Sequence, residues 1–154
     1  MLRQFLVSIA VSLGNIAIHA IVMAAVLWVA RIVDNRATSR QSLRLVGVMI
    51  ATVSVLMAAH AVEVFVWALG YFSVAAAPPG ANLVYFAFVN YTTLGYGDVV
   101  PVERWRLLGP ITALNGVLLI GWSTAVIFEV LRRTLERLDV AKDSTPAKTE
   151  QRLR

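Results

Sequence analysis

Long hydrophobic stretches separated by polar segments set the pattern of this chain. Three of them, at about residues 13–33, 45–71 and 107–131, are each long enough to cross a bilayer as a helix, which needs roughly 20 apolar residues. We therefore predict three membrane-spanning helices. In the first stretch the interior polar residues, Asn15 and His19, come near the start, which suits first turns at the membrane interface.

A fourth apolar stretch, at residues 83–91, is too short to span. Two prolines and a glycine at residues 75–82 separate it from the second long stretch, and it leads directly into the sequence TTLGYGD. A short helix that enters the membrane and returns as a loop fits both facts. The predicted fold is an all-α membrane protein with a re-entrant helix and loop between its second and third spans.

The composition agrees with a membrane protein, since 58% of the 154 residues are hydrophobic and only 15% are charged. The formal net charge of +5 does not indicate nucleic-acid binding, because the basic residues cluster beside the hydrophobic stretches and form no single patch. The chain has no cysteine, so no disulfide and no thiolate metal site is predicted.

Basic residues beside the spans predict the topology. The loop at residues 34–44 carries one acidic residue against Arg36, Arg40 and Arg44, and the stretch from Glu129 to the end carries seven basic and five acidic residues. Both are predicted to be cytoplasmic, which places the amino terminus outside a cell (inner) membrane of prokaryotic type. With Arg31, these arginines are spaced by five, four and four residues and lie mostly in a loop, so we predict no voltage sensor.

Three segments follow from this organisation. Residues 1–44 form an amino-terminal helix and basic loop, residues 45–131 a pore domain, and residues 132–154 a cytoplasmic tail. Apolar residues at spacings of three, four and three continue the last helix as an amphipathic extension: Phe128, Leu131, Leu135 and Leu138. Four such stripes would pack as a bundle; the alternative is a merely interfacial helix.

The loop after residues 83–91 has the chemistry of a dehydrating ion site. A potassium ion that sheds its water needs many oxygen ligands, and backbone carbonyls supply them when all face one side. Gly95 and Gly97 permit this because they adopt positive φ without strain. The predicted K⁺ ligands are then the carbonyls of Thr93, Leu94, Gly95 and Tyr96, with the Thr93 hydroxyl at the inner mouth. One loop gives one oxygen per level, so four subunits are required.

Residues 93–97, TLGYG, resemble the TVGYG signature of potassium-channel selectivity filters, and the resemblance extends over about residues 45–131. It implies a homotetrameric channel that conducts K⁺ passively, with an outer helix, pore helix, filter and inner helix. The filter would comprise Thr93, Leu94, Gly95, Tyr96 and Gly97. Leu94 departs from the usual valine, which puts conductance and inactivation in doubt, and Val89 stands where some two-helix channels carry a glutamate.

The resemblance also assigns residues around the filter. Asp98 matches the acidic residue that follows it, and would sit at the outer mouth and attract cations. In the family this residue bonds an aromatic of the pore helix, which Tyr85 or Phe86 would supply; only Tyr85 has a hydrogen-bonding group. Thr92 is a further candidate for filter support.

Two other features have a functional and a structural interpretation. Gly116 and Gly121 lie where inner helices of this type bend, so they are candidates either for a hinge or for close helix packing. His60 and Glu63 share one face of the second span, as a proton- or metal-sensitive element or as a buried pair that positions the helix. Zinc would need further ligands, and the other histidine, His19, falls in a different helix, so metal catalysis is not predicted.

The function predicted is potassium-selective conduction, and nothing in the sequence indicates an enzyme. No cofactor is expected besides K⁺ as the transported ion, and the expected partners are three further subunits and lipid, with no nucleic acid and no small-molecule substrate. Three alternatives stay open: a weakly selective cation channel, a non-conducting membrane sensor or subunit, and a subunit of an ion transporter.

Overall fold

The fold of this computed structural model is entirely helical in the residues that it describes, 1–33 and 41–143. Its elements are α1 (Leu2–Val33), α2 (Gln41–Ser73), α3 (Leu83–Tyr91), the 3-10 turn η1 (Glu103–Trp105) and α4 (Leu108–Asp143). The described ranges contain no strand. Three helices are long and apolar enough to cross a membrane, over Leu2–Ala30, Leu45–Ser73 and Glu103–Glu136. The predicted fold class is confirmed, and these spans support a multi-pass membrane protein.

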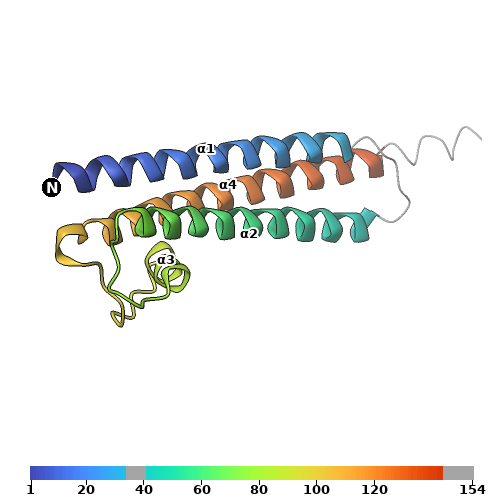
Figure 1. Cartoon of the computed structure of the whole chain (residues 1–154). Coiled ribbons are helices and arrows are strands. Elements are labelled where there is room, and N and C mark those ends of the chain that lie inside the picture. Colours follow the sequence, from blue (N-terminus) through green and yellow to red (C-terminus); the bar gives the residue numbers. More distant parts are fainter. Residues whose placement is uncertain (34–40, 144–154) are drawn as a thin grey trace, which may run out of the picture.

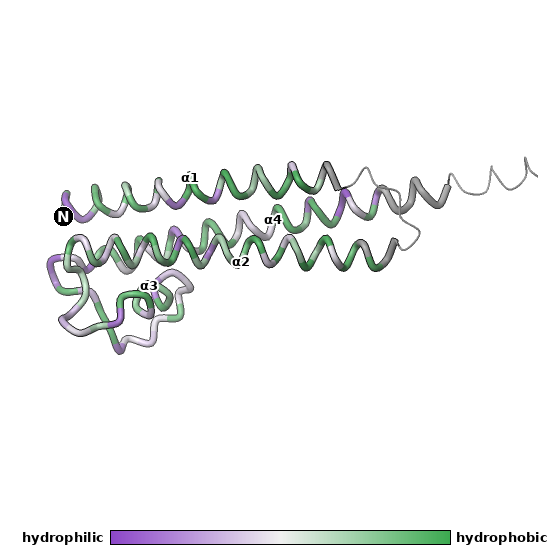
Figure 2. The backbone as a smooth tube through the Cα atoms, turned by 45° about the vertical axis from the view of Figure 1, so that its right-hand side comes forward, coloured by the Kyte–Doolittle hydropathy of each residue, from purple (hydrophilic) through white to green (hydrophobic). Residues whose placement is uncertain are grey.

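The three long helices lie side by side, and α3 lies at one end of them (Figure 1). That end also holds the amino terminus and the start of α4. Helix α1 packs against both α2 and α4, and α3 packs against the same two helices. The first helix is thus part of the bundle that supports α3. Long parts of the helices are hydrophobic, whereas hydrophilic positions gather around α3 and toward the end of α4 (Figure 2).

Polar residues of α1 explain why this helix begins at Leu2 and not near residue 13. They recur at spacings of four, four, three and four, at Gln4, Ser8, Ser12, Asn15 and His19, and therefore share one face. That face points into the bundle, since Ser8, Asn15 and His19 are fully buried. The expectation that Asn15 and His19 mark an interfacial start is wrong, because neighbouring helices cover them.

Helix α4 continues past residue 131 to Asp143, so the helical extension is confirmed. The face that it buries within the chain is Val126, Val130 and Thr134. Phe128 and Leu135 are instead exposed and Leu131 is half-buried, so this described part of the predicted apolar stripe is open to contacts outside the chain. The side chains of Leu138, Arg31, Arg36, Arg40 and Arg44 lie outside the described residues.

Two apolar clusters hold the helices together. Around α3, the fully buried side chains include Trp67, Tyr71 and Phe86, and the rings of the last two lie 4.7 Å apart. Toward the other end of the bundle, Met23 and Leu56 pack with Val126 and Val130. Several buried polar residues of α1, α2 and α4 lie between these clusters, among them His19, Glu63 and Ser123.

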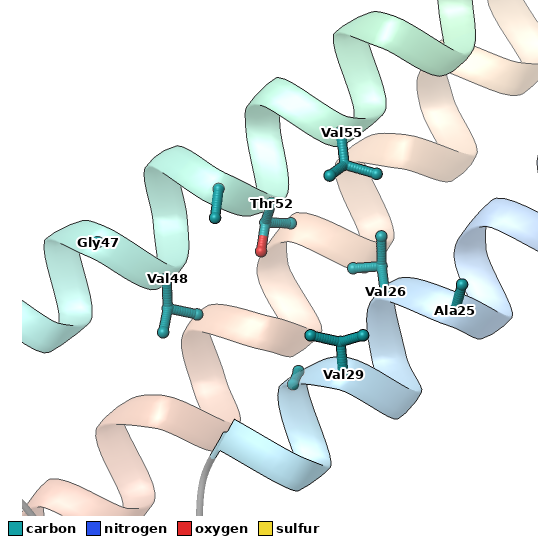
Figure 3. Close-up of a pocket in the computed structure, with 9 residues that line it drawn as sticks. Ala25, Val26, Val29, Gly47, Val48, Thr52 and Val55 are labelled. Atoms are coloured by element: carbon teal, nitrogen blue, oxygen red, sulfur yellow. The ribbon is translucent and has the colours of Figure 1, made fainter.

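A crevice of about 610 Å³ lies between α1 and α2 at the end of the bundle away from α3. Figure 3 shows its lining, which is apolar apart from Thr52 and consists of Ala25, Val26, Val29, Ala30, Gly47, Val48, Ala51, Thr52 and Val55. Because it holds one hydroxyl and no charged group, this crevice has no chemistry suited to an ion.

Gly116 is required where α4 passes the end of α3. A Cβ built at this position would lie 2.0 Å from the carbonyl oxygen of Tyr91, whereas one at Gly121 meets nothing within 4 Å. Of the two interpretations given to these glycines, close packing accounts for Gly116. Gly121 has no such contact and stays a hinge candidate.

Gly116→Ala should therefore separate α4 from α3. Overpacking of this kind costs about 1–3 kcal/mol or more, so we expect a clearly lower unfolding temperature in detergent, measured by fluorescence-detected size exclusion. Gly121→Ala adds the same methyl group to the same helix where nothing in the chain lies within 4 Å, so it is the matched control and should lose clearly less stability than Gly116→Ala. Equal melting of the two variants would contradict the packing role.

Candidate functional site

Helix α3 is capped at its start, and hydrogen bonds at its end fix where the following loop begins. The Asn82 side chain accepts a hydrogen bond from the Tyr85 amide at 3.0 Å and so caps the start of the helix. At the other end, the Thr92 amide donates to the Phe88 carbonyl and the Leu94 amide to the Val89 carbonyl, both at 3.0 Å. The loop therefore begins directly on the last carbonyls of the helix.

The backbone of this loop alternates in handedness. Positive φ occurs at Thr93 (60°), Gly95 (60°) and Gly97 (78°), while Leu94 and Tyr96 between them do not have it. In an extended chain of uniform φ successive carbonyls point to opposite sides, and alternation brings them to one side. Positive φ at the two glycines was predicted from their type. At Thr93 it was not, because a β-branched residue resists this conformation.

No other described part of the chain covers this loop. All residues from 92 to 98 are exposed, and the side chains of Leu94 and Tyr96 are 54% and 68% exposed. The hydroxyl of Thr92 donates to the Phe88 carbonyl at 2.7 Å, at the start of the loop. An ion beside this loop would have protein on one side only.

Asp98 is held at the far end of the loop by Tyr85. The Tyr85 hydroxyl donates to the Asp98 Oδ2 atom at 2.7 Å, and this bond to a carboxylate raises the pKa of Tyr85. Of the two aromatic candidates, Tyr85 makes the bond. Phe86 is buried against Tyr71 and is part of the core.

Behind α3 lies a buried polar cluster centred on the Glu63 carboxylate, which is fully buried. The Nδ1 atom of His60 lies 2.9 Å from Glu63 Oε2, as the predicted pair requires. The Nδ1 atom of His19 lies 2.7 Å from Glu63 Oε1. The Tyr91 hydroxyl donates to the same carboxylate. Three helices thus supply donors to one acidic side chain.

Ser123 closes this cluster from α4. Its Oγ atom lies 2.9 Å from His60 Nε2 and 3.4 Å from His19 Nε2. The two imidazole rings lie 5.4 Å apart, centroid to centroid, between Glu63 and Ser123. His19, which the sequence placed in a separate helix and left out of the pair, is a full member. The polar stripe of α1 is the sequence signal that would have placed His19 inside the bundle, although not beside Glu63.

A second set of buried hydrogen bonds continues along the bundle. The Asn15 Nδ2 atom donates to the Glu63 carbonyl and to Asn115 Oδ1, both at 3.2 Å. The same Asn115 oxygen accepts from Trp67 Nε1 at 2.9 Å. Tyr71 and Thr112 share a hydrogen bond of 2.6 Å between their hydroxyls. These contacts fix α1 and α2 on α4 at the level of α3.

A family model described as an ion channel matches residues 59–133, a segment that includes α3, the loop and the Glu63 cluster except His19. No curated protein matches the chain, and no solved structure does. The family match supports an ion channel, and with it a transport role for a chain that spans the membrane.

Loss of the Tyr91 hydroxyl should destabilise the bundle more than loss of the Tyr71 hydroxyl. Both tyrosines are buried, but Tyr91 donates to a carboxylate and Tyr71 shares its bond with a neutral hydroxyl. A bond to a charged group contributes about 1.5–3 kcal/mol against about 0.5–1.5 kcal/mol for a neutral one. The unfolding temperature in detergent should therefore be lower for Tyr91→Phe than for Tyr71→Phe. The reverse order would disprove this role of Tyr91.

Proposed function

We propose that the chain is one subunit of a homotetrameric, potassium-selective channel that conducts K⁺ passively. The observation that carries this proposal is the alternation of φ at Thr93, Gly95 and Gly97, in a loop that starts on the last carbonyls of α3. The filter would consist of Thr93, Leu94, Gly95, Tyr96 and Gly97. Its carbonyl oxygens would replace the water ligands of the ion.

Four copies are needed because one loop offers one oxygen at each level along the pore. The exposed Leu94 and Tyr96 side chains support this, since neighbouring subunits would cover them. So does α4, whose buried face is matched by an exposed one that carries Leu114, Leu118, Gly121 and Phe128. In a tetramer this exposed face would line the pore or contact other subunits.

Electrostatics favours a cation on both sides of this filter. The carboxyl end of α3, where the loop begins, carries the partial negative charge of the helix dipole. The carboxylate of Asp98 stands at the other end of the loop, held by Tyr85, and would attract cations at the outer mouth. The amino terminus lies at the same end of the bundle as α3 (Figure 1), which suits the proposed extracytoplasmic amino terminus.

Flux measurements test conduction and selectivity together. Purified protein in liposomes with K⁺ on one side and Na⁺ on the other should give a reversal potential near that of K⁺. Gly95→Ala and Gly97→Ala should abolish the current, because a side chain at positive φ costs about 1–2 kcal/mol and turns the carbonyls away. Comparable Na⁺ current would instead indicate the weakly selective channel, and silence at every pH and voltage a non-conducting subunit.

Gly80→Ala is the matched control for these variants. Gly80 also has positive φ, 81°, and open space around its Cβ position, but it lies in the turn before α3. It should show a similar loss of stability and retain K⁺ current. A loss of current in this variant as large as in Gly95→Ala would show that the filter variants act through general destabilisation.

The assembly should contain four chains. Native mass spectrometry of the protein released from detergent should give about four times the 16.8 kDa of one chain. A monomer or dimer that still conducts K⁺ would disprove the proposed filter, since too few carbonyls would surround the ion.

A further inference from the structure

The geometry points to a binding site for one divalent transition-metal ion of the zinc class at His19, His60 and Glu63. A ligand atom from each of these residues lies within 4.8 Å of the other two. The site joins α1 to α2 and lies beside Tyr91, the last residue of α3. It is separate from the carbonyl site proposed for K⁺, and its occupant differs in chemistry.

The donor set suits zinc. Two imidazole nitrogens and one carboxylate oxygen form a common three-ligand zinc set, with a fourth position left for water. Both imidazoles already direct Nδ1 at the carboxylate, at 2.7 and 2.9 Å. In a tetrahedral zinc site with bonds of about 2.0–2.2 Å, two ligand atoms lie about 3.3 Å apart. Small rotations of the side chains would therefore admit the ion, and the Nδ1 protons would leave as it binds.

The net charge of the cluster favours a cation. With Glu63 ionised and both imidazoles neutral, the cluster carries one negative charge at membrane depth, where an unpaired charge is costly. Among the described residues no lysine or arginine forms an ion pair with Glu63.

The outer contacts orient the ligands. A carboxylate only accepts hydrogen bonds, so neutral imidazoles would carry their protons on the Nδ1 atoms that face Glu63, and their Nε2 atoms would then be acceptors. These two acceptors face the single hydroxyl proton of Ser123, which fits the unequal distances of 2.9 Å to His60 and 3.4 Å to His19. Such outer partners fix the rings in metal sites. His60 is 20% exposed, while His19 and Glu63 are fully buried, so an ion would enter past His60.

The small number of possible metal ligands in the sequence makes a binding test simple to interpret. His19 and His60 are the only histidines, and the chain has no cysteine. In full-length protein purified through a histidine-free tag, Co²⁺ titration should give the visible bands of tetrahedral cobalt at one ion per chain, and Zn²⁺ should displace it. X-ray absorption of the Zn²⁺ form should show two imidazole ligands, a count that needs no variant. A spectrum without imidazole would overturn the proposal.

Conservative variants assign the ligands. His19→Gln, His60→Gln and Glu63→Gln should each weaken Zn²⁺ binding by more than about 100-fold, since loss of an outer partner alone costs 10–100-fold. Glu103→Gln removes an exposed carboxylate and should bind as the wild type does. Should a variant fail to fold, the imidazole count in the wild type still decides. An equal loss of affinity in Glu103→Gln would indicate adventitious surface binding and overturn the assignment.

A link from this site to conduction rests on the proposed channel function, because only Thr92 separates Tyr91 from the proposed filter. Zn²⁺ should change K⁺ flux in wild-type liposomes and leave His19→Gln unaffected. Metal binding without any effect on flux would overturn this link but not the site, and a protein that carries no K⁺ would still bind Zn²⁺. The two proposals can therefore fail separately.

Discussion

One buried carboxylate is the constraint on which the arrangement of the helices depends. An acidic side chain at membrane depth is tolerated only where protein groups donate to it, and Glu63 is fully buried. Its donors come from α1 (His19), α2 (His60) and α3 (Tyr91), while Ser123 of α4 bonds His60 in turn. Since each helix supplies a different partner, none can slide or rotate without leaving a polar group unpaired.

The loop depends on this cluster through Tyr91. The hydroxyl of Tyr91 reaches Glu63, its carbonyl lies where Gly116 leaves space for it, and the next residue begins the loop. The end of α3 is thus held by a side chain on one side and by a backbone contact on the other. The loop itself has alternating φ but no enclosing wall. Within the chain the position of the loop is fixed, and the proposed tetramer would supply the enclosure that a single chain lacks.

Local signals were enough to predict much of this from the sequence. The lengths of the apolar stretches predicted three long helices, and the residue type predicted positive φ at Gly95 and Gly97. The family resemblance predicted the Tyr85–Asp98 bond. What the sequence did not give depends on distant partners. His19 and Tyr91 lie 44 and 28 residues from Glu63, and a polar stripe on α1 does not reveal which helix it faces. Positive φ at Thr93 opposes its own propensity, so bonds to the end of α3 must impose it.

The contacts of α1 change the role expected for the first helix. A pore module needs only an outer helix, a pore helix and an inner helix, so α1 looks like an addition when only the sequence is considered. Yet its inward face supplies His19 to Glu63 and Asn15 to Asn115, and its outward face is largely apolar. Removing α1 would expose a carboxylate and an amide on α2 and α4 to lipid, at a cost of several kcal/mol for such groups. The polar interior of α2 and the helix that covers it therefore require each other, and α1 is an integral part of the helical bundle.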